Sequence, residues 1–170
     1  MLPQHQSNSQ EWYTPTNIIV AARLVLGSID LDPASSSQAN QRVKATQYFS
    51  KEVNGLAQTW CGSIFLNPPG GKLPGIPSLT KAFWSKLMMS QFNHAIFLAF
   101  SMEALQTCQP SIKHYPVCIP SKRLSFVNEL GLTVKGNTHG SAVIYVPGSV
   151  DRRDVFRDTF QHLGSIYQPY

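Results

Sequence analysis

The sequence Ser63-Ile64-Phe65-Leu66-Asn67-Pro68-Pro69 (residues 63–69) predicts a hydrophobic strand with an abrupt end. Its two prolines fix φ and remove two backbone donors, so the strand stops at Asn67. A residue that precedes proline is pushed into an extended conformation, which holds the Asn67 side chain at a defined angle. A strand that is hydrophobic throughout is typical of a parallel sheet with both faces covered.

Predicted strands and helices alternate along most of the chain on either side of this segment. The first helix is expected to have Thr14 as its N-cap and Pro15 in its first position, and to end at Gly27. Strands are expected at residues 29–31, 95–100, 117–119, 124–127, 142–146 and 165–167, and further helices at 38–43, 79–92, 103–108 and 152–162. This order predicts an α/β fold with a largely parallel sheet. The strands at 124–127 and 142–146 are expected to form an antiparallel C-terminal edge.

Length and composition fit a single domain. The chain has 170 residues, of which 42% are hydrophobic, and this is enough for one core. Residues 1–10 are polar and aperiodic, and they predict a flexible N-terminal arm before a domain at 11–170. The sequence has neither a signal peptide nor an apolar run of the roughly 20 residues that cross a bilayer, so a cytoplasmic protein is expected.

Charge and cysteine content narrow the choice of partners. The 14 Lys and Arg residues against 9 Asp and Glu give a formal charge of +5, which favours a polyanionic partner. The three cysteines and the histidines show no spacing of zinc ligands. We therefore expect reduced thiols and no bound metal.

Two segments place reactive side chains after predicted strands, where open α/β sheets bind ligands. In Asp30-Leu31-Asp32-Pro33-Ala34-Ser35-Ser36, a carboxylate at a strand end can bind an amine or a hydroxyl group. The alternative interpretation is an ordinary Asp-Pro turn that caps the next helix. In Asn67-Pro68-Pro69, the amide and a rigid carbonyl can accept both hydrogens of an amino group. The alternative there is a rigid loop in which Asn67 bonds only its own backbone.

These two segments belong to a longer series of motifs. The series consists of Glu11-Trp12-Tyr13-Thr14-Pro15, Asp30-Leu31-Asp32-Pro33-Ala34-Ser35, Asn54-Gly55-Leu56, Trp60, Asn67-Pro68-Pro69 and Lys122-Arg123-Leu124-Ser125-Phe126. In order and spacing it resembles the phage-type (Dam-like) DNA N6-adenine methyltransferases, over nearly the whole chain from Glu11. The resemblance implies a single Rossmann-like domain that uses S-adenosylmethionine (SAM) to methylate the exocyclic N6 of adenine. The implied partner is double-stranded DNA with its target base flipped, in a phage or prophage modification system that protects DNA against host nucleases.

The resemblance also implies which residues bind the cofactor. The segment Tyr13-Thr14-Pro15 matches the one that meets the SAM carboxylate, at a helix start that suits an anion. The loop Asp32-Pro33-Ala34-Ser35 matches the one that cradles the methionine part, with Asp32 near the positively charged amino group. Asn54 stands where relatives place an acid or amide against the SAM adenine.

Catalytic and DNA-binding residues follow from the same resemblance. Asn67 and the Pro68 carbonyl are expected to accept hydrogen bonds from N6, and Pro69 completes the catalytic motif. Contacts with DNA are expected at Gly70, Gly71, Lys72, Lys122 and Arg123. At 170 residues little chain is left for a separate target-reading domain. Low sequence specificity is therefore expected, or readout by the loops 70–78 and 128–141.

Gly70 departs from the family pattern, because relatives carry there an aromatic residue that stacks on the flipped base. Stacking of a base on a ring is worth roughly 1–3 kcal/mol. One interpretation is that another ring replaces it, with Tyr13, Phe83 and Trp84 as candidates. Another is a catalytically weak or lapsed homologue that only binds nucleic acid. A third is that the glycine pair admits a base, or another part of the DNA, close to the backbone. Separately, the Asn-Pro-Pro arrangement suits several planar amino groups, so a methyltransferase that uses SAM on RNA or a protein amide is a further alternative.

Overall fold

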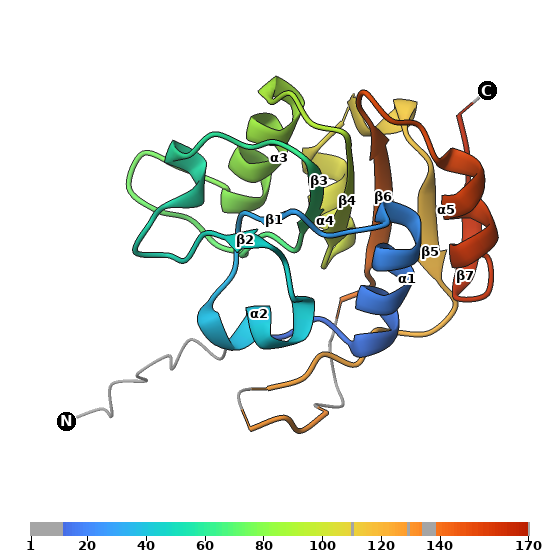
Figure 1. Ribbon diagram of the computed structural model, residues 1–170, viewed down its shortest axis with the longest axis horizontal. Coiled ribbons are helices and arrows are strands. Elements are labelled where there is room, and N and C mark those ends of the chain that lie inside the picture. The colour runs from blue at the N-terminus through green and yellow to red at the C-terminus, as the bar shows by residue number, and fades with distance from the viewer. Residues whose placement is uncertain (1–11, 110, 129, 134–138, 170) are drawn as a thin grey trace.

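One mixed sheet forms the centre of residues 12–109, 111–128, 130–133 and 139–169, the part of the chain that the computed structural model describes (Figure 1). Its seven strands in that part are β1 (Leu31–Asp32), β2 (Gln47–Tyr48), β3 (Ser63–Leu66), β4 (His94–Ala99), β5 (Val117–Pro120), β6 (Ala142–Pro147) and β7 (Gly164–Tyr167). Their order across the sheet is β2-β1-β3-β4-β6-β5-β7. The arm expected at residues 1–10 lies outside the described residues.

Strand directions divide the sheet into two parts. The pairs β1–β2, β1–β3 and β3–β4 are parallel, whereas β4–β6, β5–β6 and β5–β7 are antiparallel. Strands β6 and β7 therefore run against the others, and most strands point the same way. The predicted α/β class is confirmed.

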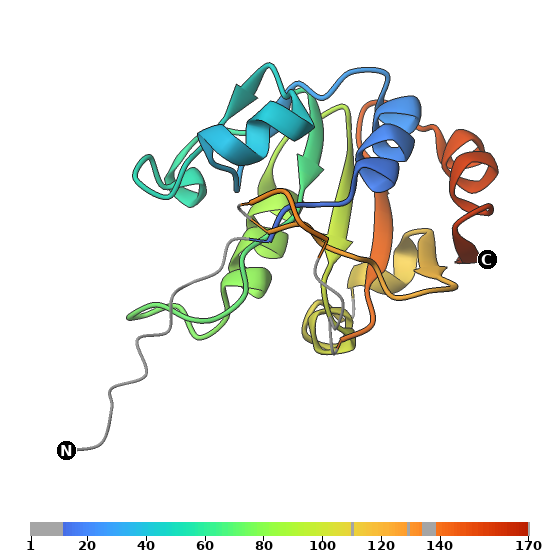
Figure 2. The ribbon, with the colours of Figure 1, turned by 90° about the horizontal axis from the view of Figure 1, so that it is seen from below.

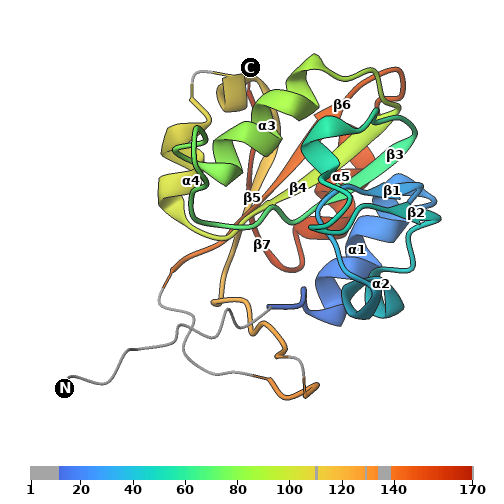
Figure 3. The same cartoon turned by 90° about the vertical axis from the view of Figure 1, so that its left-hand side faces the viewer.

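Helices cover both faces of the sheet (Figures 1 and 3). They are α1 (Thr16–Leu26), α2 (Ser37–Val43), α3 (Leu79–Met89), α4 (Met102–Thr107) and α5 (Arg153–Phe160), with the short 3-10 helices η1 (Gly55–Ala57) and η2 (Ser111–His114). Within the described residues, no helix has the length and apolar character needed to cross a membrane.

Successive side chains of β4 point to opposite faces of the sheet and contribute to two hydrophobic cores. The side chains of Phe97 and its neighbours Ala95 and Ala99 pack with α3 and α4. Ile96 and Leu98 point to the other face, where α1 and α5 cover them. Because both faces are buried, the sheet holds the loops at its ends in fixed positions.

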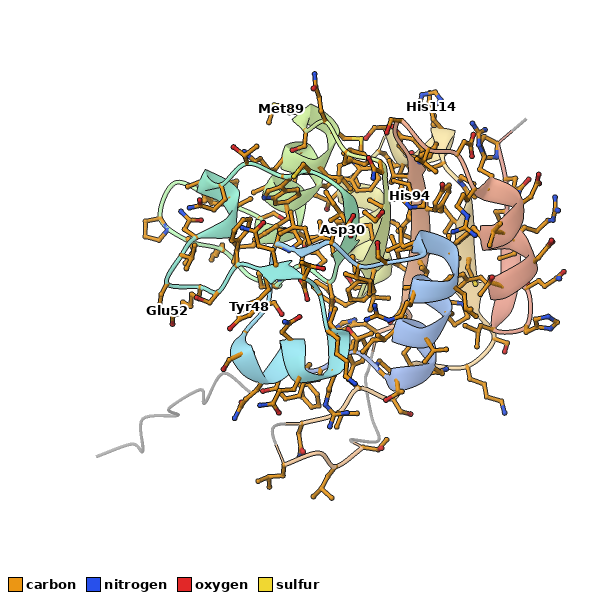
Figure 4. The ribbon with its side chains drawn as sticks, in the orientation of Figure 1. Asp30, Tyr48, Glu52, Met89, His94 and His114 are labelled. Atoms are coloured by element: carbon orange, nitrogen blue, oxygen red, sulfur yellow. The ribbon has the colours of Figure 1, made fainter. Side chains whose placement is uncertain are left out.

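The strands β1 to β5 all end at one edge of the sheet, which we call the carboxyl edge. It comprises residues 32–36, 49–54, 67–72, 100–101 and 121–123. In Figure 2 the arrows of β3 and β4 point toward this edge. At the opposite, amino edge lie Met89, ahead of β4, and His114, ahead of β5 (Figure 4). The N-terminal segment meets the carboxyl edge, since Tyr13 N donates to Val127 O (2.8 Å) and Val127 N to Tyr13 O (3.0 Å).

The strand predicted at 124–127 is wrong. Val127 makes only isolated bridges with Tyr13 and Thr133, and β6 pairs with β4 and β5 instead. Leu124 and Phe126 are buried in the core under α1 and α5. The segment therefore buries every second side chain, as a strand does, but it pairs with no strand. The antiparallel part of the sheet consists of β5, β6 and β7.

Candidate active site

Asn67 and Thr14, 53 residues apart in sequence, meet at the carboxyl edge. Asn67 directly follows β3, and its Nδ2 donates a hydrogen bond of 3.1 Å to Oγ1 of Thr14. Thr14 is only 4% exposed and Asn67 is half-buried. The structure thus differs from the alternative in which Asn67 bonds only its own backbone.

The position of Thr14 corrects the predicted start of the first helix. Helix α1 begins at Thr16 with Pro15 as its N-cap, and no side chain caps it. Thr14 lies one residue too early to cap, and its hydroxyl accepts from Asn67 instead. The backbone N–H groups of Thr16 and Asn17 donate to no acceptor among the described residues, as is usual for the first turn of a helix.

The hydrogen bond to Thr14 determines which hydrogen-bonding atoms of the predicted catalytic segment, Asn67-Pro68-Pro69, remain available. With Nδ2 of Asn67 committed, its Oδ1 has no hydrogen-bond partner among the described residues, and neither has the carbonyl oxygen of Pro68. Pro68 is buried and Pro69 is exposed, with the Pro69 carbonyl 3.4 Å from the Thr80 hydroxyl. Two acceptors on a stiff Pro-Pro backbone suit an amino group with two hydrogens.

Asp32 ends β1, beside the strand that leads to Asn67. It is 3% exposed and accepts hydrogen bonds from the Ala34 backbone N–H (3.3 Å) and from the Ser35 side chain. Burial raises the pKa of this carboxyl to about 6, and the hydrogen bonds from Ser35 and Ala34 only partly offset it. No cation pairs with Asp32 within the described residues, so the site fits a positively charged group.

Asp30, two residues earlier, has a different role. It accepts hydrogen bonds from the Ser63 backbone N–H and the Ser28 hydroxyl, each 2.8 Å long. The Ser63 bond is the main cause that lowers the pKa of this carboxyl. Asp30 therefore joins the amino ends of β1 and β3, while Asp32 faces the carboxyl edge.

The loop after β2 packs on the loop after β1. Ser35 N donates to Phe49 O (2.9 Å) and Phe49 N to Asp32 O (3.0 Å). A β-carbon on Gly55 would lie 2.0 Å from the carbonyl oxygen of Pro33. Pro33 is buried, Ala34 and Ser35 are half-buried, and Asn54 is exposed with a left-handed φ of 55°. The predicted cofactor residues 32–35 and 54 thus lie on two neighbouring loops.

We expect Gly55→Ala to reduce the free energy of unfolding by roughly 1–3 kcal/mol, because its β-carbon overlaps a backbone atom that cannot rotate away. Chemical denaturation measures the change. Gly140→Ala is the matched control, since nothing lies within 4 Å of its β-carbon and its φ is outside the left-handed region. Equal stability of the two variants would contradict the close approach.

A hollow of about 440 Å³ lies between the N-terminus of α2 and the loop after β2. It is lined by Ser36, Ser37, Tyr48, Ser50, Glu52 and Val53. Figure 4 shows Tyr48 and Glu52 on this side of the molecule. Of these residues, sequence reasoning singled out only Ser36, and it missed Tyr48, Ser50, Glu52 and Val53. Neither this hollow nor one of about 450 Å³ near Phe92 and Tyr115 at the amino edge includes Asn67 in its lining.

The candidate DNA-binding residues gather at the same edge. Gly70, Gly71 and Lys72 are exposed after β3, just before a turn that is closed by mutual hydrogen bonds between Leu73 and Ile76. Lys122 and Arg123 are exposed after β5. The loop predicted at 128–141 is described only at 128, 130–133 and 139–141.

The three rings considered as replacements for an aromatic residue at position 70 make other contacts in the structure. Phe83 stacks on Trp60 at 5.9 Å, and Trp84 meets Phe97 edge-on at 5.0 Å, so both pack in the core. Tyr13 is buried, its hydroxyl donates to Gln38 (2.8 Å), and the Arg42 guanidinium lies 5.9 Å from its ring centroid. Phe83 and Trp84 are therefore unsuitable as candidates for the ring that replaces an aromatic residue at position 70.

Comparisons with known proteins bear on the family of the chain. Residues 3–159 match the family model described as DNA N-6-adenine-methyltransferase (Dam). No curated protein matches the chain significantly. Among the described residues, no group of three or more His, Cys, Asp or Glu side chains could hold a metal ion.

Proposed function

Since the chain belongs to the DNA N-6-adenine-methyltransferase (Dam) family, we propose that it transfers a methyl group from SAM to the N6 amino group of adenine in DNA. The hydrogen bond between Thr14 and Asn67 is the observation that carries the proposal. It orients an amide at the carboxyl edge, beside the strand that ends in the buried Asp32.

The residues at this edge fit SAM, which supplies an electrophilic methyl group on a sulfonium centre. The Asp32 carboxylate, buried without a cation among the described residues, suits the ammonium group. The N–H groups of Thr16 and Asn17 suit the carboxylate. The hollow lined by Tyr48, Glu52 and Val53, the residue before Asn54, suits the nucleoside part.

Asn67 and Pro68 act on the acceptor nitrogen. Their oxygens accept hydrogen bonds from the two N–H groups of N6. These bonds orient the nitrogen lone pair and increase the electron density on the nitrogen while it attacks the methyl group. Thr14 fixes the amide so that its oxygen, not its nitrogen, faces the amino group. Because base pairing holds one N–H of N6 and stacking holds the ring within the duplex, the base has to be flipped out for N6 to reach these two oxygens.

A methyl-transfer assay tests the proposal. The protein is incubated with SAM labelled in its methyl group and with unmethylated duplex DNA, RNA or a protein mixture, and modified nucleosides are identified by mass spectrometry. We expect N6-methyladenine in DNA, and protection of that DNA from nucleases that cut only unmethylated adenine sites, as in phage modification systems. Label in RNA or protein alone would assign another acceptor. Nucleic-acid binding without SAM binding would indicate a lapsed homologue.

We expect Lys122→Ala to weaken binding to duplex DNA and to reduce the slope of log K against log[salt] by about 0.9, the value for one phosphate contact. Fluorescence anisotropy at several salt concentrations measures both. Lys113→Ala is the matched control, because Lys113 in η2 precedes β5 at the amino edge, whereas Lys122 follows it at the carboxyl edge. Equal slopes for the two variants would place the DNA elsewhere.

A further inference from the structure

The ring of Phe100 lies against Gly70, directly after the catalytic Asn67-Pro68-Pro69. A β-carbon on Gly70 would be 2.9 Å from Cζ of Phe100, and 3.5 and 3.6 Å from Cε1 and Cε2. The φ of Gly70 is outside the left-handed region, so its backbone would accept any residue. The glycine therefore provides space for the ring and is not required by a turn.

Parallel pairing of β3 and β4 brings this ring to the catalytic segment. Leu66 at the end of β3 is opposite Phe97, and β4 ends at Ala99. Phe100 thus leaves the sheet at the same edge as Asn67. Phe100 is half-buried, so the protein covers this residue only in part.

A buried hydroxyl group, that of Ser141, lies opposite Phe100 on the segment that leads into the neighbouring strand β6. Ala99 pairs with Ala142, which places Ser141 across from Phe100. Ser141 is 5% exposed, and its Oγ has no hydrogen-bond partner among the described residues. Buried hydroxyl groups normally form a hydrogen bond, so this one could accept one from, or donate one to, a polar group that enters the site. A polar atom on the rim of a nucleobase would be such a partner.

We propose that Phe100 provides the stacking surface for the target adenine, and that Gly70 leaves room for this ring. The inference rests on the proposed function, since it assigns a base-binding residue to the same site. A planar base held by Asn67 needs an aromatic or apolar face beside it, and flipped bases are commonly bound in this way. Phe100 offers such a face next to the catalytic segment, whereas Phe83 and Trp84 are in the core.

The test uses Phe100→Leu, which keeps an apolar side chain of similar bulk and removes the ring. We expect kcat/KM for unmethylated duplex DNA to fall about 5- to 150-fold, the value of one base–aromatic stack. The Kd for SAM, measured by calorimetry, and the thermal midpoint are expected to stay unchanged. Phe100→Tyr keeps a ring and is expected to retain kcat/KM within about threefold.

Two further variants separate stacking from packing. Phe92→Leu is the matched control, because Phe92 is also half-buried but precedes β4 at the amino edge, and its kcat/KM is expected to match the wild type. The double variant Gly70→Phe with Phe100→Ala moves the ring to the other side of the contact. It is expected to recover most of the activity that Phe100→Ala alone loses.

The outcomes distinguish this inference from the proposed function. If the wild type methylates DNA and Phe100→Leu is as active as Phe92→Leu, the stacking role is overturned and the proposed function stands. If Phe100→Tyr loses as much as Phe100→Leu, or SAM affinity falls equally, the role is structural and the inference is also overturned. If the wild type methylates no DNA, the proposed function fails and the inference fails with it.

Discussion

Asn67→Ala is expected to reduce kcat for methyl transfer by on the order of 10³-fold, while the affinity for SAM stays close to that of the wild type. The variant removes the side-chain acceptor that orients N6, and loss of one positioned hydrogen-bonding group in an active site costs about 10²- to 10³-fold. Initial rates with labelled SAM measure kcat, and calorimetry measures the Kd for SAM. An equal loss of SAM affinity and rate would argue against the assigned role.

Three controls refine this prediction. Asn67→Asp keeps an acceptor oxygen, and Thr14 can then donate to it, so part of the activity is expected to remain. Thr14→Val leaves Asn67 in place but removes the hydroxyl that orients its amide, and a smaller loss of kcat is expected. Asn93→Ala changes an exposed asparagine just before β4, at the amino edge, and is expected to have wild-type activity.

Asp32→Asn is expected to stabilise the protein and to abolish SAM binding. Burial raises the pKa of Asp32 from 3.8 to about 6, so at pH 7 the folded protein holds an unfavourable buried charge. Each pKa unit corresponds to 1.36 kcal/mol, so the uncharged amide is expected to raise the free energy of unfolding by up to about 3 kcal/mol. Denaturation at pH 7.5 measures the change in stability, and calorimetry measures SAM binding.

The pH dependence has a defined sign. Because the folded protein binds the Asp32 proton more tightly than the unfolded chain, its contribution to stability is fully present below pH 3.8 and is lost as the pH rises through about 6. SAM binding is expected to show the opposite trend and to weaken below pH 6, where protonation removes the charge that pairs with the ammonium group.

Asp30→Asn is the matched control for Asp32→Asn, since the same substitution two residues away is expected to have the opposite effect. The Ser63 N–H lowers the pKa of Asp30, so this carboxylate stabilises the fold above its unfolded pKa and loses that effect as the pH falls. Asp30→Asn should reduce stability at pH 7.5. If Asp32→Asn also reduced it, the assignment of Asp32 as a desolvated, unpaired carboxylate would be wrong.

Local signals predicted the parts of the fold that depend on neighbouring residues. The prolines after Asn67 gave the end of β3 correctly, and Gly27 is the C-cap of α1 with a φ of 76°. The alternation at 124–127 led to a wrong strand, because the pairing partner is chosen by distant residues. Thr14 was misread for the same reason, since its hydroxyl bonds an amide 53 residues away and not the nearby helix.

Residues of the candidate site could be predicted from the sequence only where a short motif contains the reactive side chain itself. Asp32 and Asn67 follow strands that end at one edge, and strand order alone places them near each other. Phe100 and Glu52 could not be found this way. The contact of Phe100 with Gly70 depends on the register of β3 against β4, and the hollow beside Glu52 depends on how two loops pack.

The two ends of the described chain lie at opposite edges of the sheet, and this affects how the protein should be handled. Tyr13 pairs with Val127 at the carboxyl edge, whereas β7 runs against β5 and so ends, at Tyr167, at the amino edge. A purification tag or surface anchor on the N-terminal side is joined to the fold through Tyr13 and Thr14, at the edge where the proposed function places the DNA. One fused after Tyr167 is joined at the amino edge, so we expect C-terminal immobilisation to be the better geometry for binding measurements.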